Sequence, residues 1–242
     1  MPVLLLLYPD ESPDLITSIS LAVVFFNALS GSWAYARMGR IDYKSGLLFA
    51  TATVPGAIFG ALTTAYIPRR LFNLIFGLLL LAIAVLLIFR PSLKTEVKRR
   101  NPAFGLTRHV VEADGNSYTF SYNPVVGVGL SFFVGYISSL LGIGGGIIHV
   151  PALVQLLNFP VHIATATSHF ILTIMALAGT SVHIAKGVFV HGIRCTIALA
   201  IGVLFGAQLG ARLSNRVRGD WIIRGLAIAL QLVAIRLLVT AL

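Results

Sequence analysis

The stretch LLGIGGGIIHVPALVQL, residues 140–156, places four glycines within five positions between two apolar runs. Glycine has no Cβ, so it lets the backbone turn sharply and lets a neighbouring group approach closely. A shorter apolar piece, about 146–157, follows the glycines. The stretch therefore predicts a helix, a break and a short second helix, with the break at Gly142, Gly144, Gly145 and Gly146.

The rest of the chain is strongly apolar and carries little charge. Its 242 residues are 57% hydrophobic and 11% charged, whereas a soluble domain carries roughly 25% charged residues. A membrane-spanning helix needs about 20 mostly apolar residues. Runs without Asp, Glu, Lys or Arg cover 15–36, 45–68, 71–89, 115–185 and 195–211. This pattern predicts an all-α, multi-pass protein of the cytoplasmic membrane, in contact with the lipid bilayer.

The basic excess fits the same class. The formal net charge is +10, but Lys and Arg are scattered between apolar runs and gather on no basic face, which argues against a nucleic-acid partner. The one cysteine, Cys195, lies in an apolar run and permits no internal disulfide. We expect no cofactor.

The apolar runs predict seven long helices and one polar connection. The helices are expected near 15–36, 45–66, 71–89, 124–141, 164–186, 193–213 and 221–241. Within the polar connection, the sequence RHVVEADGNSYTFSYN predicts two short strands around an Asp114-Gly115 turn. We therefore expect a first membrane repeat at 1–89, an extramembrane linker at 90–123 and a second membrane repeat at 124–242.

The two halves resemble each other. Five groups of residues recur in the same order at a spacing of 148 to 150 positions, which indicates an internal duplication. They are Pro2 with Pro151, Thr17-Ser18 with Thr167-Ser168, Gly39 with Gly187, 56–61 with 206–211, and Arg70 with Arg218. A counterpart of the glycine break would fall before Met1. We therefore expect a first repeat without its opening helix, whether through a wrongly assigned start, a fragment or a real reduced form.

Two topologies compete, and the loop charges favour one of them. If 124–157 crosses the membrane once, 11 Lys and Arg lie on one side of the membrane and 6 on the other, with one unplaced. If the segment returns to its own side, 13 lie on one side and 5 on the other. The positive-inside rule favours the returning hairpin. That arrangement leaves Asp10, Glu11 and Asp14 outside and makes the halves inverted repeats, a recurrent transporter architecture.

Non-helical backbone at membrane depth persists only where protein or a water-filled cavity surrounds its N–H and C=O groups. After the break, GGGIIHVPAL, which contains Pro151, begins a short helix whose free N–H groups and positive dipole end can face an anion. The alternative is that glycines allow tight helix packing. We prefer packing for scattered glycines such as Gly60 and Gly210, and an anion-binding hairpin for the break.

The sequence GYISSLLGIGGGIIHVPAL at 135–153, followed by ATATS at 164–168, resembles the TauE/SafE family, also called the toluene-sulfonate uptake permeases. The resemblance covers nearly the whole chain and includes PGAIFGA at 55–61. It implies a transporter that moves sulfite, thiosulfate, sulfoacetate or other organosulfonates across the cytoplasmic membrane. The chain departs from the family pattern in lacking the first glycine motif.

Hydroxyl side chains near the starts of two corresponding helices are candidate substrate ligands. They can donate to sulfonate oxygens or cap their helices, and the repeat predicts that the two helix starts meet near the midplane from opposite sides. These residues are Thr165, Thr167 and Ser168 in the second half and Thr17 and Ser18 in the first. Asn27 lies in the middle of an apolar run, so we expect it to face the protein interior, for an interhelix hydrogen bond or a ligand contact.

Five of the six histidines fall in the second half, in runs that contain no partnering carboxylate or thiolate, so we expect no bound metal. His169 adjoins Ser168, and it either couples transport to protons or packs between helices. Lys186 and Arg37 end corresponding helices, either as anchors at the membrane surface or as groups that attract an anion into a vestibule.

These features favour a secondary transporter of a small sulfur-containing oxyanion. No GxxxxGKS or GxxxxGKT phosphate-binding loop is present, and a tetrahedral –SO₃⁻ group suits a pocket of N–H and hydroxyl donors. Two alternatives stay open. One is a truncated or accessory membrane subunit without independent transport. The other is a membrane-embedded enzyme, which usually needs an ionisable group inside the membrane. An oligomer is possible but nothing in the sequence indicates one.

Overall fold

The computed structural model describes residues 1–89, 105–214 and 219–241 of the chain. It is mostly helical, with one small sheet. The helices are α1 (Pro2–Leu7), α2 (Pro13–Arg37), α3 (Tyr43–Thr64), α4 (Arg69–Phe89), α5 (Pro124–Leu141), α6 (Gly146–Leu156), α7 (Val161–Ala185), α8 (Ile193–Ser214) and α9 (Gly219–Ala241), with a 3₁₀ turn η1 (Val188–Gly192). Four of them, α2, α3, α5 and α7, are long and apolar enough to cross a membrane.

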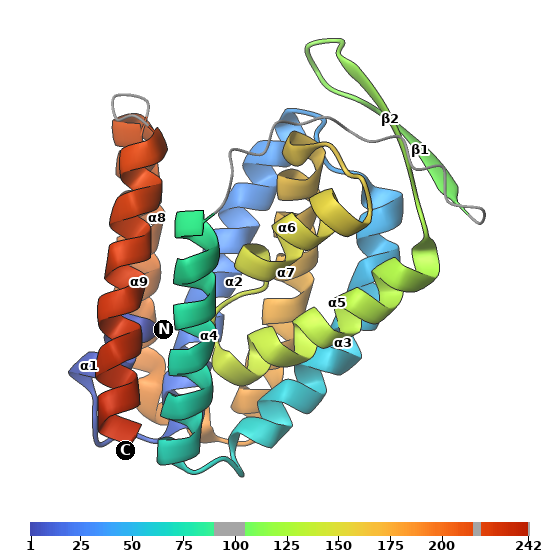
Figure 1. Cartoon of the computed structure of the whole chain (residues 1–242). Helices are drawn as coiled ribbons and strands as arrows, with labels where there is room; N and C mark the ends of the chain where they lie inside the picture. Colours follow the sequence, from blue (N-terminus) through green and yellow to red (C-terminus); the bar gives the residue numbers. More distant parts are fainter. Residues whose placement is uncertain (90–104, 215–218, 242) are drawn as a thin grey trace.

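The helices form two groups on either side of α2. In Figure 1, α4, α8 and α9 stand together on one side, and α3 and α5 lie side by side on the other. Gly56 and Gly60 carry no side chain where the backbone of α5 crosses α3, at Phe132 and Tyr136. A Cβ at either glycine would overlap that backbone. The expected packing role of Gly60 is therefore confirmed, whereas the surroundings of Gly210 lie outside the described side chains.

The predicted hairpin forms as expected. Strands β1 (Leu106–Val111) and β2 (Ser117–Tyr122) pair antiparallel, with Leu106 opposite Tyr122 and Val111 opposite Ser117. The turn between them contains Gly115 at φ +86°, a backbone region that glycine adopts without strain. The hairpin caps one end of the bundle (Figure 1). Residues 90–104 of the predicted linker lie outside the described part of the chain.

Apolar and ionic contacts hold the hairpin in place. Its side chains Phe120 and Tyr122 are buried against Phe49 of α3 and Phe159, which follows α6. Arg40, in the loop between α2 and α3, pairs with Glu112 next to the turn at 3.0 Å. The hairpin is therefore joined to the membrane helices rather than separate from them.

Five helices begin two or three residues earlier than the sequence predicts, among them α2 and α7. Helix α2 starts at Pro13 instead of 15, because the Ser12 side chain accepts the Leu15 N–H and proline suits the first helical position. Helix α7 starts at Val161 instead of 164, directly after Pro160. The division into repeats at 1–89 and 124–242 stays a prediction.

Candidate functional site

The glycine stretch breaks the helix, as the sequence predicts. Helix α5 ends at Leu141, and Gly142 follows in the left-handed region at φ +62°. The N–H groups of Gly142 and Ile143 both donate to the carbonyl of Ser138, which closes the end of α5. Gly144 is also left-handed, at φ +67°, and α6 begins at Gly146. Two left-handed residues so close together require glycine.

Helix α6 returns along α5 toward the start of α5. Leu157, at the end of α6, lies 3.2 Å from the Cβ position of Gly127, near the start of α5. His149 of α6 is buried and its Nε2 lies 3.2 Å from the Oγ of Ser131 in α5. The segment 124–157 is therefore a hairpin, as the loop charges favoured. Its orientation across the membrane stays a prediction.

Helices α2 and α7, together with Val134 of α5, enclose the break. From α2, Thr17 and Ser20 contact Gly142, and the Ser20 hydroxyl donates to the Gly142 carbonyl at 2.5 Å. Val24 of α2 packs against Gly144, and Met175 of α7 lies near Gly145. The three glycines Gly142, Gly144 and Gly145 are buried. The break thus lies inside the helix bundle and not against its surroundings.

Four buried hydroxyl groups on the helices around the break have no partner among the described residues. They are Thr17 Oγ1, Ser138 Oγ, Ser139 Oγ and Thr180 Oγ1. Ser138 Oγ lies 3.3 Å from the Cβ position of Gly145. A buried hydroxyl that lacks a hydrogen bond costs about 1–3 kcal/mol. The Ser138 hydroxyl is therefore available at the break to donate to another polar group.

The start of α6 adds backbone donors to these hydroxyls. No side chain caps the helix at Gly145, so the N–H groups of its first turn have no side-chain acceptor. A Cβ at Gly146 would meet no atom within 4 Å, so there is open space directly at the first residue of α6. Helix dipole, free N–H groups and the Ser138 hydroxyl together can hold a small anion.

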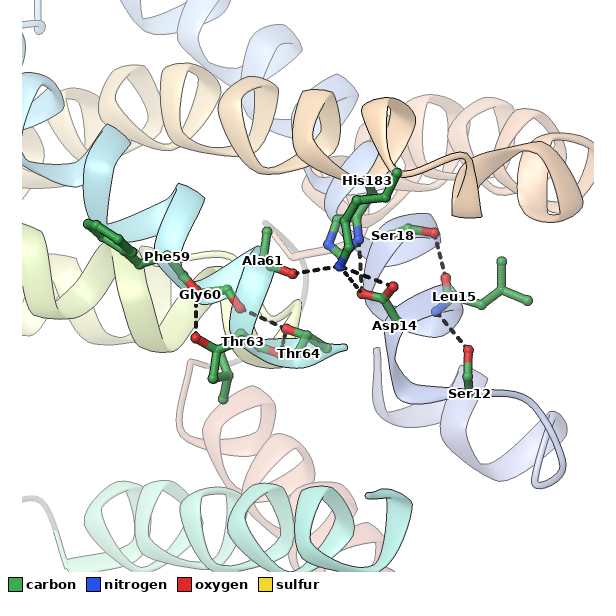
Figure 2. Close-up of polar contacts among 12 residues, drawn as sticks. Ser12, Asp14, Leu15, Ser18, Phe59, Gly60, Ala61, Thr63, Thr64 and His183 are labelled. Atoms are coloured by element: carbon green, nitrogen blue, oxygen red, sulfur yellow. Dashed lines mark hydrogen bonds and ion pairs between the residues drawn. The ribbon is translucent and has the colours of Figure 1, made fainter. Parts of the chain in front are cut away.

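A charged cluster, in which Asp14 and His183 are buried and Lys186 is exposed, lies one helical turn along α2 from the residue that contacts Gly142. Figure 2 shows Asp14 of α2 and His183 of α7 pointing toward each other, with Ala61 of α3 beside them. The Asp14 carboxylate lies 3.2 Å from His183 Nδ1 and 3.3 Å from Lys186 Nζ. Lys186 Nζ also donates to the Ala61 carbonyl at 3.3 Å.

The charged cluster adds contacts that the sequence did not predict. Asp14 was expected on the outer side of the membrane with Asp10 and Glu11; that side stays a prediction, and the structure shows that Asp14 is only 8% exposed. Lys186 was expected as a surface anchor or as a group that attracts an anion; both roles stay predictions, and its ammonium group pairs with Asp14. No short sequence pattern predicts the cluster, because 172 residues separate Asp14 from Lys186 and only the packing of α2 on α7 brings them together. Arg37 stacks over the ring of Trp33 at 5.2 Å, as an interfacial side chain would.

The opposite end of the α2–α7 pair holds a second polar network. The Thr167 hydroxyl accepts the Asp42 N–H at 3.1 Å. Asp42 caps α3 by accepting the Ser45 N–H, and the Ser45 hydroxyl lies 2.6 Å from the Tyr122 hydroxyl of the hairpin. Arg108, also from the hairpin, donates to Ser45 Oγ at 3.3 Å and lies 3.9 Å from Asp42.

The two hydroxyl pairs do not meet, contrary to the sequence prediction. Helices α2 and α7 run antiparallel, since Asp14 pairs with Lys186 while Gly31 packs against His169. Thr17 therefore lies on the order of 20 Å from Thr167 along the helix axes. The prediction assumed that both helices enter at the midplane, but each spans the bundle and starts at its own end.

Helix capping does not explain these hydroxyls either. Ser12 caps α2 and the backbone of Pro160 precedes α7. The Ser18 hydroxyl donates to the Leu15 carbonyl at 2.7 Å, and Thr165 donates to the Val161 carbonyl at 2.8 Å. Both hydroxyls are thus used within their own helices. Ser168 is fully buried and its hydroxyl has no partner among the described residues.

Asn27 is exposed, which corrects the expectation that it faces the interior. It lines an open groove of about 440 Å³ between α2 and α8, together with Val23, Val24, Gly202, Val203 and Gly206. The groove exists because the glycines of α8 place no side chain opposite the amide. Val24 also contacts Gly144, so the groove adjoins the break.

The remaining candidates occupy less distinctive positions. His169 is partly buried, packs against Gly31 and Tyr35, and has its Nδ1 3.0 Å from the Thr165 carbonyl. Pro151 lies inside α6 and is partly buried. Among the described residues, no group of three or more His, Cys, Asp or Glu side chains could hold a metal ion.

Comparison with known proteins adds independent information. The family model described as sulfite exporter TauE/SafE matches residues 1–237. The probable membrane transporter protein YunE of Bacillus subtilis is 34% identical over 96% of this chain and 83% of its own. YdhB of the same organism is 27% identical over 81% and 73%, and MJ0441 of Methanocaldococcus jannaschii is 21% identical over 82% and 69%. Both are also described as probable membrane transporter proteins. No solved structure matches the chain.

Proposed function

Because the chain belongs to the TauE/SafE sulfite exporter family, we propose that it is a secondary transporter of small sulfur-containing oxyanions that binds them at the glycine break. Membership makes it a multi-pass membrane transporter and not an enzyme. The proposed substrates are sulfite, thiosulfate, sulfoacetate and related organosulfonates. The proposed direction is export, after the description of the family.

One observation carries the proposal: the first turn of α6 has uncapped N–H groups, open space at Gly146 and an unpartnered buried hydroxyl at Ser138. A sulfonate or thiosulfate group presents three acceptor oxygens, which suit several converging N–H and O–H donors. None of these donors carries a full charge. Binding of this kind is weak enough to allow release, which a transporter requires.

The proposed site extends from the break into its surroundings. Gly142, Gly144, Gly145 and Gly146 shape the backbone, and Pro151 lies further along the same short helix. Thr17 contributes a second unpartnered hydroxyl from α2. The groove beside Asn27 is the proposed approach to the break, since Val24 belongs to both. We leave Thr165, Thr167 and Ser18 out of the site, because their hydroxyls have protein partners.

We further propose that the two halves are inverted repeats. What supports this is the pairing of corresponding helices in opposite directions. Helices α2 and α7 are antiparallel, and so are α4 and α9, since Gly77 faces Leu238 while Arg70 donates to the Ala241 carbonyl. Helices related by a twofold axis in the membrane plane would pack in this way.

The experiment uses Gly146→Leu. A Cβ at Gly146 meets no atom within 4 Å, so we expect the variant to insert and fold, and we expect the leucine to occupy the volume in front of the α6 donors. We expect thiosulfate binding to the purified protein to fall at least about 100-fold, and flux in proteoliposomes to be lost.

Gly129→Leu is the matched control. Gly129 lies in α5, is exposed, and its Cβ position also meets no atom within 4 Å. This variant is expected to bind and transport thiosulfate as the unaltered protein does. Unchanged binding in Gly146→Leu, or an equal loss in both variants, would reject the site.

A further inference from the structure

The Asp14–His183–Lys186 cluster is a second feature of the molecule that the proposed anion site does not use. His183 is fully buried, and its Nε2 has no hydrogen-bond partner among the described residues. Its Nδ1 faces the Asp14 carboxylate at 3.2 Å. Lys186 Nζ donates to both oxygens of the same carboxylate, each at 3.3 Å. The three side chains join the first turn of α2 to the C-terminal end of α7, and Figure 2 shows Asp14 and His183 of this cluster.

The charge of this cluster depends on one proton. With His183 neutral, the charges of Asp14 and Lys186 cancel; with His183 protonated, the cluster carries one net positive charge. A buried net charge is costly unless an opposite charge lies nearby. Protonation of His183 is therefore favoured when an anion occupies a neighbouring site.

The anion site proposed above lies along the same two helices as the cluster. Thr17, which contacts Gly142, lies one helical turn after Asp14, and Thr180 lies one turn before His183. One turn is about 5 Å. The start of α6 is farther away, because Gly145 lies near Met175, which precedes His183 by eight residues, or about 12 Å along α7. Charges at such a separation inside a protein are screened much less than charges in water.

We infer that His183 is the binding site for a proton that is taken up together with the oxyanion. The inference rests on the proposed function and adds the coupling ion to it. A bound anion raises the proton affinity of His183 by some factor. By linkage, a proton on His183 raises the affinity of the protein for the anion by the same factor. Lowering the pH then strengthens anion binding, and raising the pH weakens it.

The groups that face His183 are few. Among the side chains that the structure describes, α2 presents Asp14, α7 presents Lys186, and α3 presents the uncharged carbonyl of Ala61. Arg194, at the start of the neighbouring α8, is exposed. The side chain of His191 in η1 lies outside the described part of the chain, so the experiment includes it as a control.

The test measures proton uptake on thiosulfate binding to the full-length purified protein. Thiosulfate is the probe because its own charge does not change between about pH 5 and about pH 8, the range in which histidines titrate. Calorimetry in buffers of different ionisation enthalpy counts the protons. We expect the unaltered protein to take up at most one proton for each thiosulfate that it binds. Its affinity for thiosulfate should fall by up to about tenfold for each unit by which the pH rises.

His183→Gln is expected to bind thiosulfate without proton uptake and with an affinity that does not vary with pH. His169→Gln and His191→Gln are expected to keep the uptake. A role of His183 in packing alone would change stability but leave the proton count of the protein unchanged. Proton uptake that persists in His183→Gln would overturn the inference.

Two further outcomes separate this inference from the proposed function. Thiosulfate binding by the unaltered protein without any proton uptake overturns the inference and leaves the function standing. An unaltered protein that binds neither thiosulfate nor sulfite at any pH overturns both. If His183→Gln does not fold, Asp14→Asn decides: loss of the carboxylate is expected to move the pH dependence to lower pH, and an unmoved dependence overturns the inference.

Discussion

Thr17 of α2 and Thr167 of α7 stand at corresponding positions of the two similar halves, and both are fully buried. Their hydroxyl groups have opposite surroundings. Thr17 lies beside Gly142 and its hydroxyl has no protein partner. Thr167 accepts the N–H of Asp42, within a network that continues to the hairpin.

The comparison shows that a repeated sequence motif does not guarantee a repeated role. The hairpin brings Arg108 and Tyr122 to the Thr167 end, where they complete a network of hydrogen bonds. At the Thr17 end the neighbouring element is the glycine break, whose backbone at Gly142 packs directly against Thr17. A buried hydroxyl contributes to stability where it has a partner, and it is available for a ligand where it has none.

Asp42→Ala is the strongest test of the hydrogen-bond network at the Thr167 end. Asp42 caps α3, accepts from Ser45 and lies near Arg108, so its loss leaves several buried groups without a partner. We expect the free energy of unfolding to fall by about 3 kcal/mol, with little change in thiosulfate affinity. Thermal denaturation in detergent measures the first and calorimetry the second. Asp114→Ala, in the exposed hairpin turn, is the control and should cost about 0.5 kcal/mol.

Thr167→Val keeps the size of the side chain and removes only the hydroxyl. The buried N–H of Asp42 then has no acceptor, so we expect a loss of about 2 kcal/mol in the free energy of unfolding. Thiosulfate affinity should stay within about twofold, because the site lies at the other end of the helix pair. A large loss of affinity with unchanged stability would remove the distinction between the two ends.

Thr17→Val is the same change at the other end and has the smallest expected effect. Its hydroxyl has no partner, so the free energy of unfolding should not fall. We expect thiosulfate affinity to fall about tenfold, the value of one hydrogen bond to an anion. Binding assays and denaturation of the same preparation give both quantities. A loss of stability without a loss of affinity would make Thr17 a structural residue like Thr167.

Local features of the sequence predicted much of the fold. The apolar runs located the membrane helices to within a few residues, and the Asp114-Gly115 turn located the hairpin. The glycines at 142–146 located the break, since only glycine adopts two left-handed conformations there at no steric cost. These features depend on residues adjacent in the chain, where hydropathy and backbone sterics act directly.

The candidate site was predicted in part. The break was identified, but Ser138 and the Asp14–His183–Lys186 cluster were not. Ser138 is one of several serines in an apolar helix, and nothing local distinguishes it. Asn27 was misplaced because the face of α2 that it occupies is opposite the glycines of α8, which no local pattern relates to it.

The sequence by itself determined that this chain is a multi-pass helical protein with one broken helix, because each of these properties follows from short stretches read alone. Only the tertiary structure decided which buried polar groups have partners. Asp14 meets Lys186 and Thr167 meets Asp42 across 172 and 125 residues of chain. Such pairs depend on the direction and register of packed helices, which the apolar periodicity of one helix does not specify.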